Sequence, residues 1–230
     1  MTGVLDSVTA DDLRFAPAYD IAAAGRYLSV PPSTMRNWFC GSNGGEPVLD
    51  AAARGPAYIS FIGLTEAHVL SAIRAVHRVP LQRIRHAVEY LKRTLKSDHP
   101  LLTHEFQTDG LDLFVEELGS LINVSKSGQA AMREVVQVYL QRIDWDDRHL
   151  PRRLFPFTQT GWDTDPRVIV IDPRVAFGRP MIGRSGITTV AVAERFKAGE
   201  SIESLANDFD RSTVEIEAAI RSELEVDTAA

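Results

Sequence analysis

Residues 172–221 constrain the fold most, because they hold three short segments of helical periodicity separated by strong breakers. Gly199 separates the first segment from the second, and the polar run from Asp208 to Ser212 separates the second from the third. Three short helices with a tight turn before the last predict a helix-turn-helix module over this stretch.

Several local signals give this module more detail. The apolar run from Val168 to Ile171 predicts a short buried strand, and the glycines that follow it suggest a small hairpin. Gly199 is expected to end the first helix, and Ser212 or Thr213 to cap the last. The side chains expected to point inward are Leu205 and Phe209 in the second helix and Val214, Ile216 and Ile220 in the third, and the first helix is expected to begin with Val190, Val192, Ala193 and Phe196.

The chain as a whole has 230 residues, of which 44% are hydrophobic, enough for a sizeable core in one large domain or in two to three small ones. No stretch has the order of a signal peptide or the length of a membrane span, so we expect a soluble, cytoplasmic protein with no membrane contact. Cys40 is the only cysteine, which excludes an intrachain disulfide and fits a reducing compartment.

The net charge of −6 is distributed unevenly. Residues 1–100 carry 11 Lys/Arg against 9 Asp/Glu, whereas residues 101–230 carry 14 against 22. The N-terminal part is therefore +2 and the remainder −8, and positive charge is densest from Arg74 to Lys96. If one half of the chain binds phosphates, the charges favour the N-terminal half.

A second helix-turn-helix pattern lies near the N-terminus. Asp20 can cap a helix that ends at the Ser29–Pro32 stretch, and Ser33 can cap a second helix. The inward positions of these two helices are Ile21, Ala24, Leu28, Met35 and Trp38. The outward positions of the second helix are Thr34, Arg36 and Asn37, whose hydrogen-bonding groups suit phosphates and base edges.

This N-terminal stretch resembles the winged helix-turn-helix of the MerR family. The matching residues are Tyr19, Ile21, Leu28, Val30, Pro32, Thr34, Met35, Arg36 and Trp38. The resemblance implies a wing built from a strand at Pro47–Leu49, a turn at Arg54–Pro56 and a strand at Ala57–Phe61, followed by a helix capped by Thr65. The DNA-binding residues that follow from it are Ser33, Thr34, Arg36, Asn37 and Trp38 in the recognition helix and Arg54 in the wing.

The middle of the chain predicts helices around a hairpin. A helix is expected over Leu81–Leu95, whose basic face could contact DNA, support a dimer or be an ordinary solvated surface. Strands are expected at Leu111–Glu116 and Leu121–Val124, after a turn at 108–110, and a helix at Gln129–Ile143. Residues 144–166 read as a connector that is too aromatic to be fully disordered.

The C-terminal stretch is similar to the family catalogued as domain of unknown function 433. The shared pattern keeps Gly178, Pro180, Ile182, Gly183, Gly199, Ser201 and Ile202, and it departs at Ser185–Gly186, where that family usually has Thr-Arg. The order of a MerR-like module followed by this one resembles VapB antitoxins of VapBC-like toxin-antitoxin pairs. The resemblance implies a cognate PIN-like ribonuclease toxin as partner, operator DNA and autorepression of the operon.

Charge distinguishes the two helix-turn-helix patterns. The last predicted helix exposes Glu215 and Glu217, a surface that phosphate repels, so DNA is expected at the N-terminal pair and protein at the C-terminal pair. Arg179 and Arg184 on the predicted hairpin could pair with carboxylates of the toxin, although they could also be ordinary exposed turn residues. The candidate toxin-binding residues are thus Arg179, Arg184, Glu215 and Glu217.

No catalytic, cofactor or metal site can be assembled from the sequence. The six histidines lack the spacing of a helical zinc site, and no phosphate-binding loop is present. We therefore expect a non-enzymatic protein with no cofactor and a twofold homodimer suited to a symmetric operator. The alternative is a stand-alone MerR-type transcription regulator with a ligand-sensing C-terminal part, although a lone cysteine cannot form the usual thiolate metal site.

The expected fold class is α+β and mainly α-helical, with an N-terminal winged helix-turn-helix, a middle helix and hairpin region, and a C-terminal three-helix module. The corresponding segments are a mobile leader (1–17), the winged helix-turn-helix (18–80), the middle region (81–143), the connector (144–166) and the C-terminal module (167–230).

Overall fold

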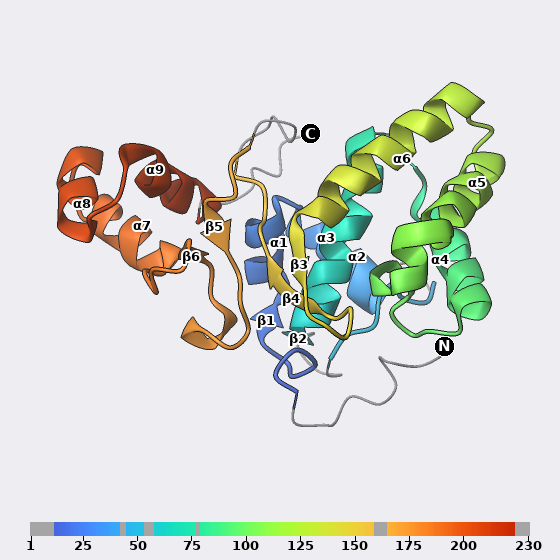
Figure 1. The fold of residues 1–230 in the computed structure, drawn as a ribbon, viewed down its shortest axis with the longest axis horizontal. Coiled ribbons are helices and arrows are strands. Elements are labelled where there is room, and N and C mark those ends of the chain that lie inside the picture. The colour runs from blue at the N-terminus through green and yellow to red at the C-terminus, as the bar shows by residue number, and fades with distance from the viewer. Residues whose placement is uncertain (1–11, 42–44, 53–57, 77–78, 159–164, 224–230) are drawn as a thin grey trace.

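The computed structural model describes residues 12–41, 45–52, 58–76, 79–158 and 165–223 (Figure 1). Helices α1–α6 and strands β1–β4 gather on one side of the view, and α7–α9 with β5 and β6 form a separate group on the other. Each group has its own hydrophobic core. The larger core draws on both the N-terminal helices and the middle of the chain, which therefore fold together.

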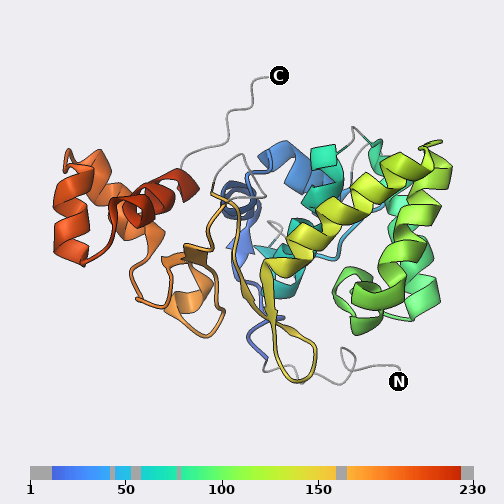
Figure 2. The same ribbon diagram turned by 45° about the horizontal axis from the view of Figure 1, so that its top comes forward.

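The larger core is built around α3 (Phe61–Val76). The segment from Phe61 to Ile73 is buried on every side, as its nearly continuous apolar sequence requires. The elements around it are β1 (Tyr19–Asp20), α1 (Ile21–Leu28), α2 (Pro32–Cys40), β2 (Tyr58–Ile59), α4 (Leu81–Leu95), α5 (Leu111–Leu121) and α6 (Lys126–Gln141). Of these, α6 lies along α3 in both ribbon views (Figures 1 and 2).

Two of the buried polar side chains of α3 are titratable, His68 and Glu66. Burial lowers the pKa of His68 to about 3, so its ring is neutral, and its Nε2 lies 3.1 Å from the carbonyl oxygen of Tyr139. Glu66 accepts a 2.8 Å hydrogen bond from Nδ1 of His99. Burial opposes the charge on His99, but the carboxylate of Glu66 outweighs it and raises the pKa of His99.

The wing expected from the sequence takes a different form. Pro47–Leu49 is not a strand; Val48 and Leu49 are buried in a bend, and both backbone N–H groups donate to the carbonyl of Trp38. Strand β2 pairs instead with β1, in antiparallel register Tyr19 to Ile59. The next helix begins at Phe61, so Thr65 lies inside it and its hydroxyl donates to the Phe61 carbonyl. The predicted turn at 54–56 lies outside the described residues.

The middle region is helical where strands were expected. A π-helical turn (Phe106–Gly110) leads directly into α5, and Gly110 has helical backbone angles. The predicted strand at Leu111–Glu116 is wrong because Leu111, Phe114, Val115 and Leu118 are all buried, at a spacing of three and four. The predicted strand at Leu121–Val124 is also wrong, since it is the end of α5 and the turn before α6. The predicted helix Leu81–Leu95 is confirmed as α4.

The flanking segments are more structured than their composition suggests. Residues 1–11 lie outside the described residues, but from Asp12 the leader makes contacts, since Arg14 bonds to both Asp12 and Asp146 and Phe15 packs on the core. The connector contains an antiparallel hairpin of β3 (Ile143–Trp145) and β4 (Pro151–Leu154). This hairpin also bonds to the C-terminal group through a bridge between Leu154 and Ile171.

The C-terminal group matches the sequence prediction closely. Strand β5 (Ile169–Val170) pairs with β6 (Met181–Ile182), and the helices are α7 (Thr189–Lys197), α8 (Ile202–Phe209) and α9 (Thr213–Ser222). Gly199 has a φ of 100°, as a terminator does, and Ser212 forms a capping box with Glu215. One expected inward side chain is wrong, since Val214 is 51% exposed.

The fold is thus α+β and mainly α-helical, with two helix-turn-helix units. Within the described residues, no helix is long and apolar enough to cross a membrane. The same residues contain no group of three or more His, Cys, Asp or Glu side chains that could hold a metal ion.

Candidate nucleic-acid and partner-binding sites

The N-terminal helix-turn-helix is formed by α1, a tight turn and α2. The side chain of Asp20 caps α1 by accepting a 2.7 Å bond from the N–H of Ala23, as predicted. Ser29 turns the chain with a φ of 53°, and Val30 then donates to the carbonyl of Gly25. A Cβ on Gly25 would lie 2.7 Å from the carbonyl oxygen of Val30. The absence of a side chain at position 25 is therefore what allows α2 to follow α1 so closely.

The start of α2 is set by prolines and not by Ser33. Pro31 is the N-cap and Pro32 the first helical residue, where a missing N–H costs nothing. The predicted cap at Ser33 is wrong, since Ser33 lies one residue inside the helix and is exposed. Met35 and Trp38 are both buried, which fixes the orientation of α2 and turns Arg36 outward.

The predicted DNA-binding residues divide into three groups. Ser33 and Arg36 are exposed on one face of α2, with Thr34 and Asn37 half-buried beside them. Trp38 is only 1% exposed and packs in the core, so its assignment as a DNA contact is wrong. Arg54 lies outside the described residues. Among the residues that are described, Arg36 has no ion-pair partner, so its charge is available to a ligand.

A contact that the sequence does not reveal ties α4 to the end of α2. The backbone N–H of Leu49 donates to the carbonyl of Trp38, and the next residue, Asp50, accepts a 2.9 Å bond from Nζ of Lys92. Lys92 is thus half-buried and paired, whereas Arg93 and Lys96 at the same end of α4 are exposed. These two cations line one hollow with Lys92, Glu89 and Asp98, so their charge is partly offset there.

The predicted toxin-binding residues lie on two different elements. Arg179 and Arg184 are exposed on either side of β6. Glu215 and Glu217 are half-buried on α9 and already have partners. The Glu215 carboxylate accepts bonds from the backbone N–H and hydroxyl of Ser212, and that of Glu217 accepts a bond from Arg221. The two arginines therefore keep more of their bonding capacity free for a partner than the two glutamates do.

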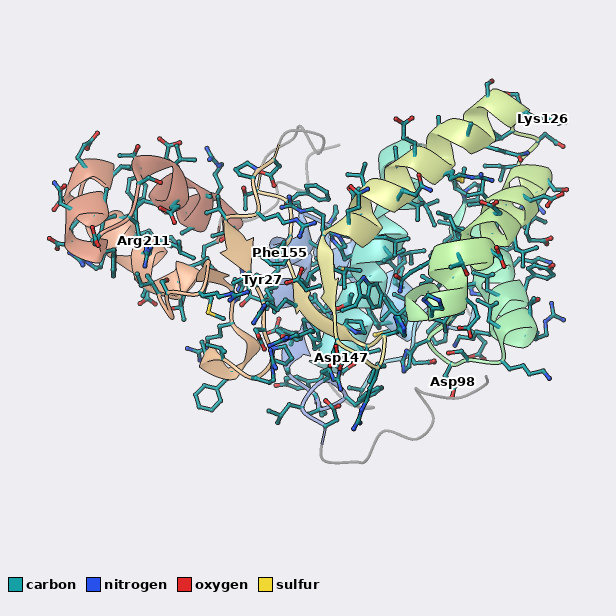
Figure 3. The ribbon with its side chains drawn as sticks, in the orientation of Figure 1. Tyr27, Asp98, Lys126, Asp147, Phe155 and Arg211 are labelled. Carbon is teal, nitrogen blue, oxygen red and sulfur yellow. The ribbon has the colours of Figure 1, made fainter. Side chains whose placement is uncertain are left out.

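The charges of the second helix-turn-helix, α8 with α9, differ from those of the first. Its exposed acidic residues include Glu203, Asp208 and Asp210, with Arg211 as an exposed cation just before α9 (Figure 3). Arg195 of α7 bonds to both Glu200 and Asp208, and its hydrogen bond to Glu200 lowers the pKa of that carboxyl group. The outer surface of these helices is therefore acidic, which disfavours a polyanion.

The junction between the two cores is a further feature that sequence reasoning missed. The hydroxyl of Tyr19 donates a 3.0 Å bond to the carbonyl of Gly178, and Nε of Arg153 in β4 bonds to Asp172. Burial raises the pKa of Tyr19, which keeps the phenol protonated as a donor. Burial also opposes the charge on Asp172, but hydrogen bonds from Arg174 and Arg153 lower its pKa below the ordinary value. No local pattern signals contacts between residues that lie 159 positions apart.

Comparison with known proteins agrees with this division of the chain. Residues 17–88 match the family described as "Putative DNA-binding HTH domain", and residues 169–221 match "Protein of unknown function (DUF433)". The chain is 33% identical over 224 residues to a Mycobacterium tuberculosis protein named "Putative antitoxin VapB45", covering 86% of this chain and 90% of that protein. It is 25% identical over 213 residues to the uncharacterized protein Rv2308 of the same organism, with 88% of each chain covered.

A solved structure has the same overall fold. The crystal structure of Rv2018 from Mycobacterium tuberculosis superposes with a TM-score of 0.68 at 27% identity. The match covers 89% of this chain and 98% of that one. The similarity thus extends across both cores and not only across the N-terminal helix-turn-helix.

Proposed function

The chain belongs to the family of the mycobacterial relative named "Putative antitoxin VapB45", and we propose that it is a DNA-binding antitoxin that neutralises a ribonuclease toxin. In this proposal α1 and α2 bind operator DNA and repress the operon, and the C-terminal group binds the toxin. The DNA-binding part of this proposal rests on the geometry of α2. Its buried residues Met35 and Trp38 fix the helix so that Ser33 and Arg36 lie on an exposed face.

Electrostatics supports the assignment of DNA to the first helix-turn-helix. An exposed arginine without a carboxylate partner can bond bidentately to guanine or pair with phosphate, whereas a paired one has lost part of that capacity. Arg36 is exposed and has no carboxylate partner among the described residues. The acidic surface of α8 and α9 would repel phosphate and suits a basic protein partner instead.

Replacing Arg36 with alanine should weaken binding to the DNA upstream of the protein's own gene by about 1 to 3 kcal/mol if Arg36 contacts a base. The effect should appear in fluorescence anisotropy at several salt concentrations, with a salt slope smaller by about one if Arg36 contacts a phosphate. Arg211→Ala is the matched control, because it removes an exposed arginine from the second helix-turn-helix. Equal losses in both variants, or a loss only in Arg211→Ala, would contradict the assignment.

The antitoxin half is tested by co-expression with the protein encoded by the neighbouring gene. We expect the two proteins to co-purify and RNA cleavage by the neighbour to stop when both are present. A neighbour that has ribonuclease activity and keeps it at a saturating ratio of the two proteins would rule out neutralisation. DNA binding with no protein partner, altered by small molecules, would support the alternative of a stand-alone transcription regulator.

A further inference from the structure

The loop between β5 and β6 displays a phenylalanine in an unusual way. Phe177 is 94% exposed, the most exposed large hydrophobic side chain among the described residues. Its backbone is also left-handed, with a φ of 55°, between Ala176 at 50° and Gly178 at 74°. A non-glycine residue in this region is strained, and an exposed ring gains nothing from burial in return. The folded chain alone therefore gives no reason for a phenylalanine at this position.

The loop is nevertheless held firmly from both ends. At its start, the buried carboxylate of Asp172 accepts bonds from the backbone N–H and side chain of Arg174, and from Arg153. At its end, the carbonyl of Gly178 accepts the hydroxyl of Tyr19, and a Cβ on Gly178 would lie 2.5 Å from that oxygen. The backbone that carries Phe177 is thus held in place before any partner binds, which reduces the backbone entropy lost on binding.

Exposed apolar side chains and arginines lie on and beside this loop. Val175 in the loop and Leu13 are 43% and 56% exposed, and Leu13 lines a cleft with Arg152 and with Pro173 and Arg174 at the start of the loop. Asp12, Arg14 and Asp146 line the same cleft and are paired with one another. Arg152 and Arg179 are exposed and have no ion-pair partner in the described parts of the chain. A central aromatic side chain with arginines around it is the composition of an interface hot spot.

We propose that Phe177 is the anchor by which this protein docks onto its ribonuclease partner, with the ring in an apolar pocket and Arg152 and Arg179 facing an acidic rim. The inference rests on the proposed function, because it identifies the surface that the toxin contacts. The acidic rim is inferred from charge complementarity, because Arg152 and Arg179 would pair with carboxylates at the edge of the partner's pocket.

Nucleic acid is a poorer occupant of this surface. The guanidinium of Arg174 is bonded to Asp172, so much of the positive charge near the ring is already neutralised. The loop lies beside β1 and well away from α2 in both ribbon views (Figures 1 and 2). A DNA duplex bound at Arg36 would therefore not also contact the Phe177 ring.

The test replaces Phe177 with asparagine in the full-length chain and measures affinity for the protein encoded by the neighbouring gene. Asparagine tolerates the left-handed region, so the melting temperature should stay the same or rise. The dissociation constant should increase about 30-fold, which corresponds to about 2 kcal/mol. Phe196→Gln serves as the matched control, because it removes a partly exposed ring from α7 and should leave the affinity within about twofold.

Four results would overturn the proposal, and they are distinguishable. If the wild-type chain does not bind the neighbour-encoded protein, both the proposed function and this inference fail. If wild type binds and Phe177→Asn binds equally well, only the inference fails. A loss of DNA binding with unchanged toxin affinity would make the loop a nucleic-acid contact. A change in oligomeric state alone, by sedimentation, would make it a contact between copies of this chain.

Discussion

Replacing Trp38 with alanine should lower the free energy of unfolding of the larger core by about 3 to 5 kcal/mol. Trp38 is fully buried between α2 and the rest of the core, and its backbone carbonyl accepts the N–H groups of both Val48 and Leu49. Removing the indole leaves a cavity at the point where α2 is attached. Chemical denaturation followed by circular dichroism measures the loss, and Trp145 and Trp162 remain as fluorescent probes.

A second substitution at this position, Trp38→Phe, distinguishes a core residue from a DNA contact. If Trp38 acts only through packing, Trp38→Phe should keep most of the stability, and its DNA affinity should match that of the wild type under conditions where both are folded. Arg36→Ala should show the opposite pattern, with stability unchanged and DNA affinity reduced, because Arg36 is exposed. A Trp38→Phe protein with wild-type stability and strongly reduced DNA binding would return Trp38 to the interface.

The helices were predictable wherever one face carried all the apolar residues and a cap marked the start. This holds for α1 with Asp20, for α9 with Ser212 and for α4 with its apolar spacing. The prediction failed at α5, because LDLFVEEL alternates well enough to resemble a strand and the choice depends on packing against α4 and α6. Short apolar runs near glycine carry too little periodicity to separate the two structures.

Some residues of the candidate sites can be placed from local sequence spacing, and others cannot. The outward placement of Arg36 and the inward placement of Met35 follow from helical spacing alone. The orientation of Phe177 does not, because it depends on three consecutive left-handed residues and on Tyr19, which lies far away in the sequence. The sequence offers Ser212 or Thr213 as the cap of the last helix, but the bonds that Ser212 donates to the Glu215 carboxylate, which leave it less available to a partner, are seen only in the structure.

The segment that joins the two cores depends on one buried arginine. Arg142 follows α6, and its guanidinium donates to the carbonyls of Phe155, Pro156 and Asp165 at 2.8, 3.2 and 2.7 Å. It also lies 4.6 Å from the centre of the Phe157 ring. These bonds satisfy three backbone carbonyls of the segment that leads from β4 towards β5. The labelled Phe155 lies between the two groups of elements in Figure 3.

Arg142→Met should destabilise the larger core by about 3 to 5 kcal/mol, because it removes the countercharge of a buried carboxylate. The side chain of Asp165 is 0% exposed, and besides Arg142 it accepts only the backbone N–H and hydroxyl of Thr158 within the described residues. Methionine fills similar volume, so the loss would come from the unpaired charge and carbonyls more than from a cavity.

A double-mutant cycle identifies the source of that loss. Asp165→Asn removes the charge and keeps one oxygen to accept the N–H of Thr158, and its NH2 group can donate to the Thr158 hydroxyl. Adding it to Arg142→Met should therefore recover about 1 to 3 kcal/mol relative to Arg142→Met alone. Hydrogen exchange should show faster exchange in β3 and β4 for Arg142→Met, with α7–α9 protected, since the second core does not include this arginine. If the two substitutions are additive, the carbonyl bonds of Arg142 hold the segment and its charge pairing contributes little. In that case Arg142→Gln, whose side chain can still donate to a carbonyl, should be more stable than the double variant with Arg142→Met and Asp165→Asn.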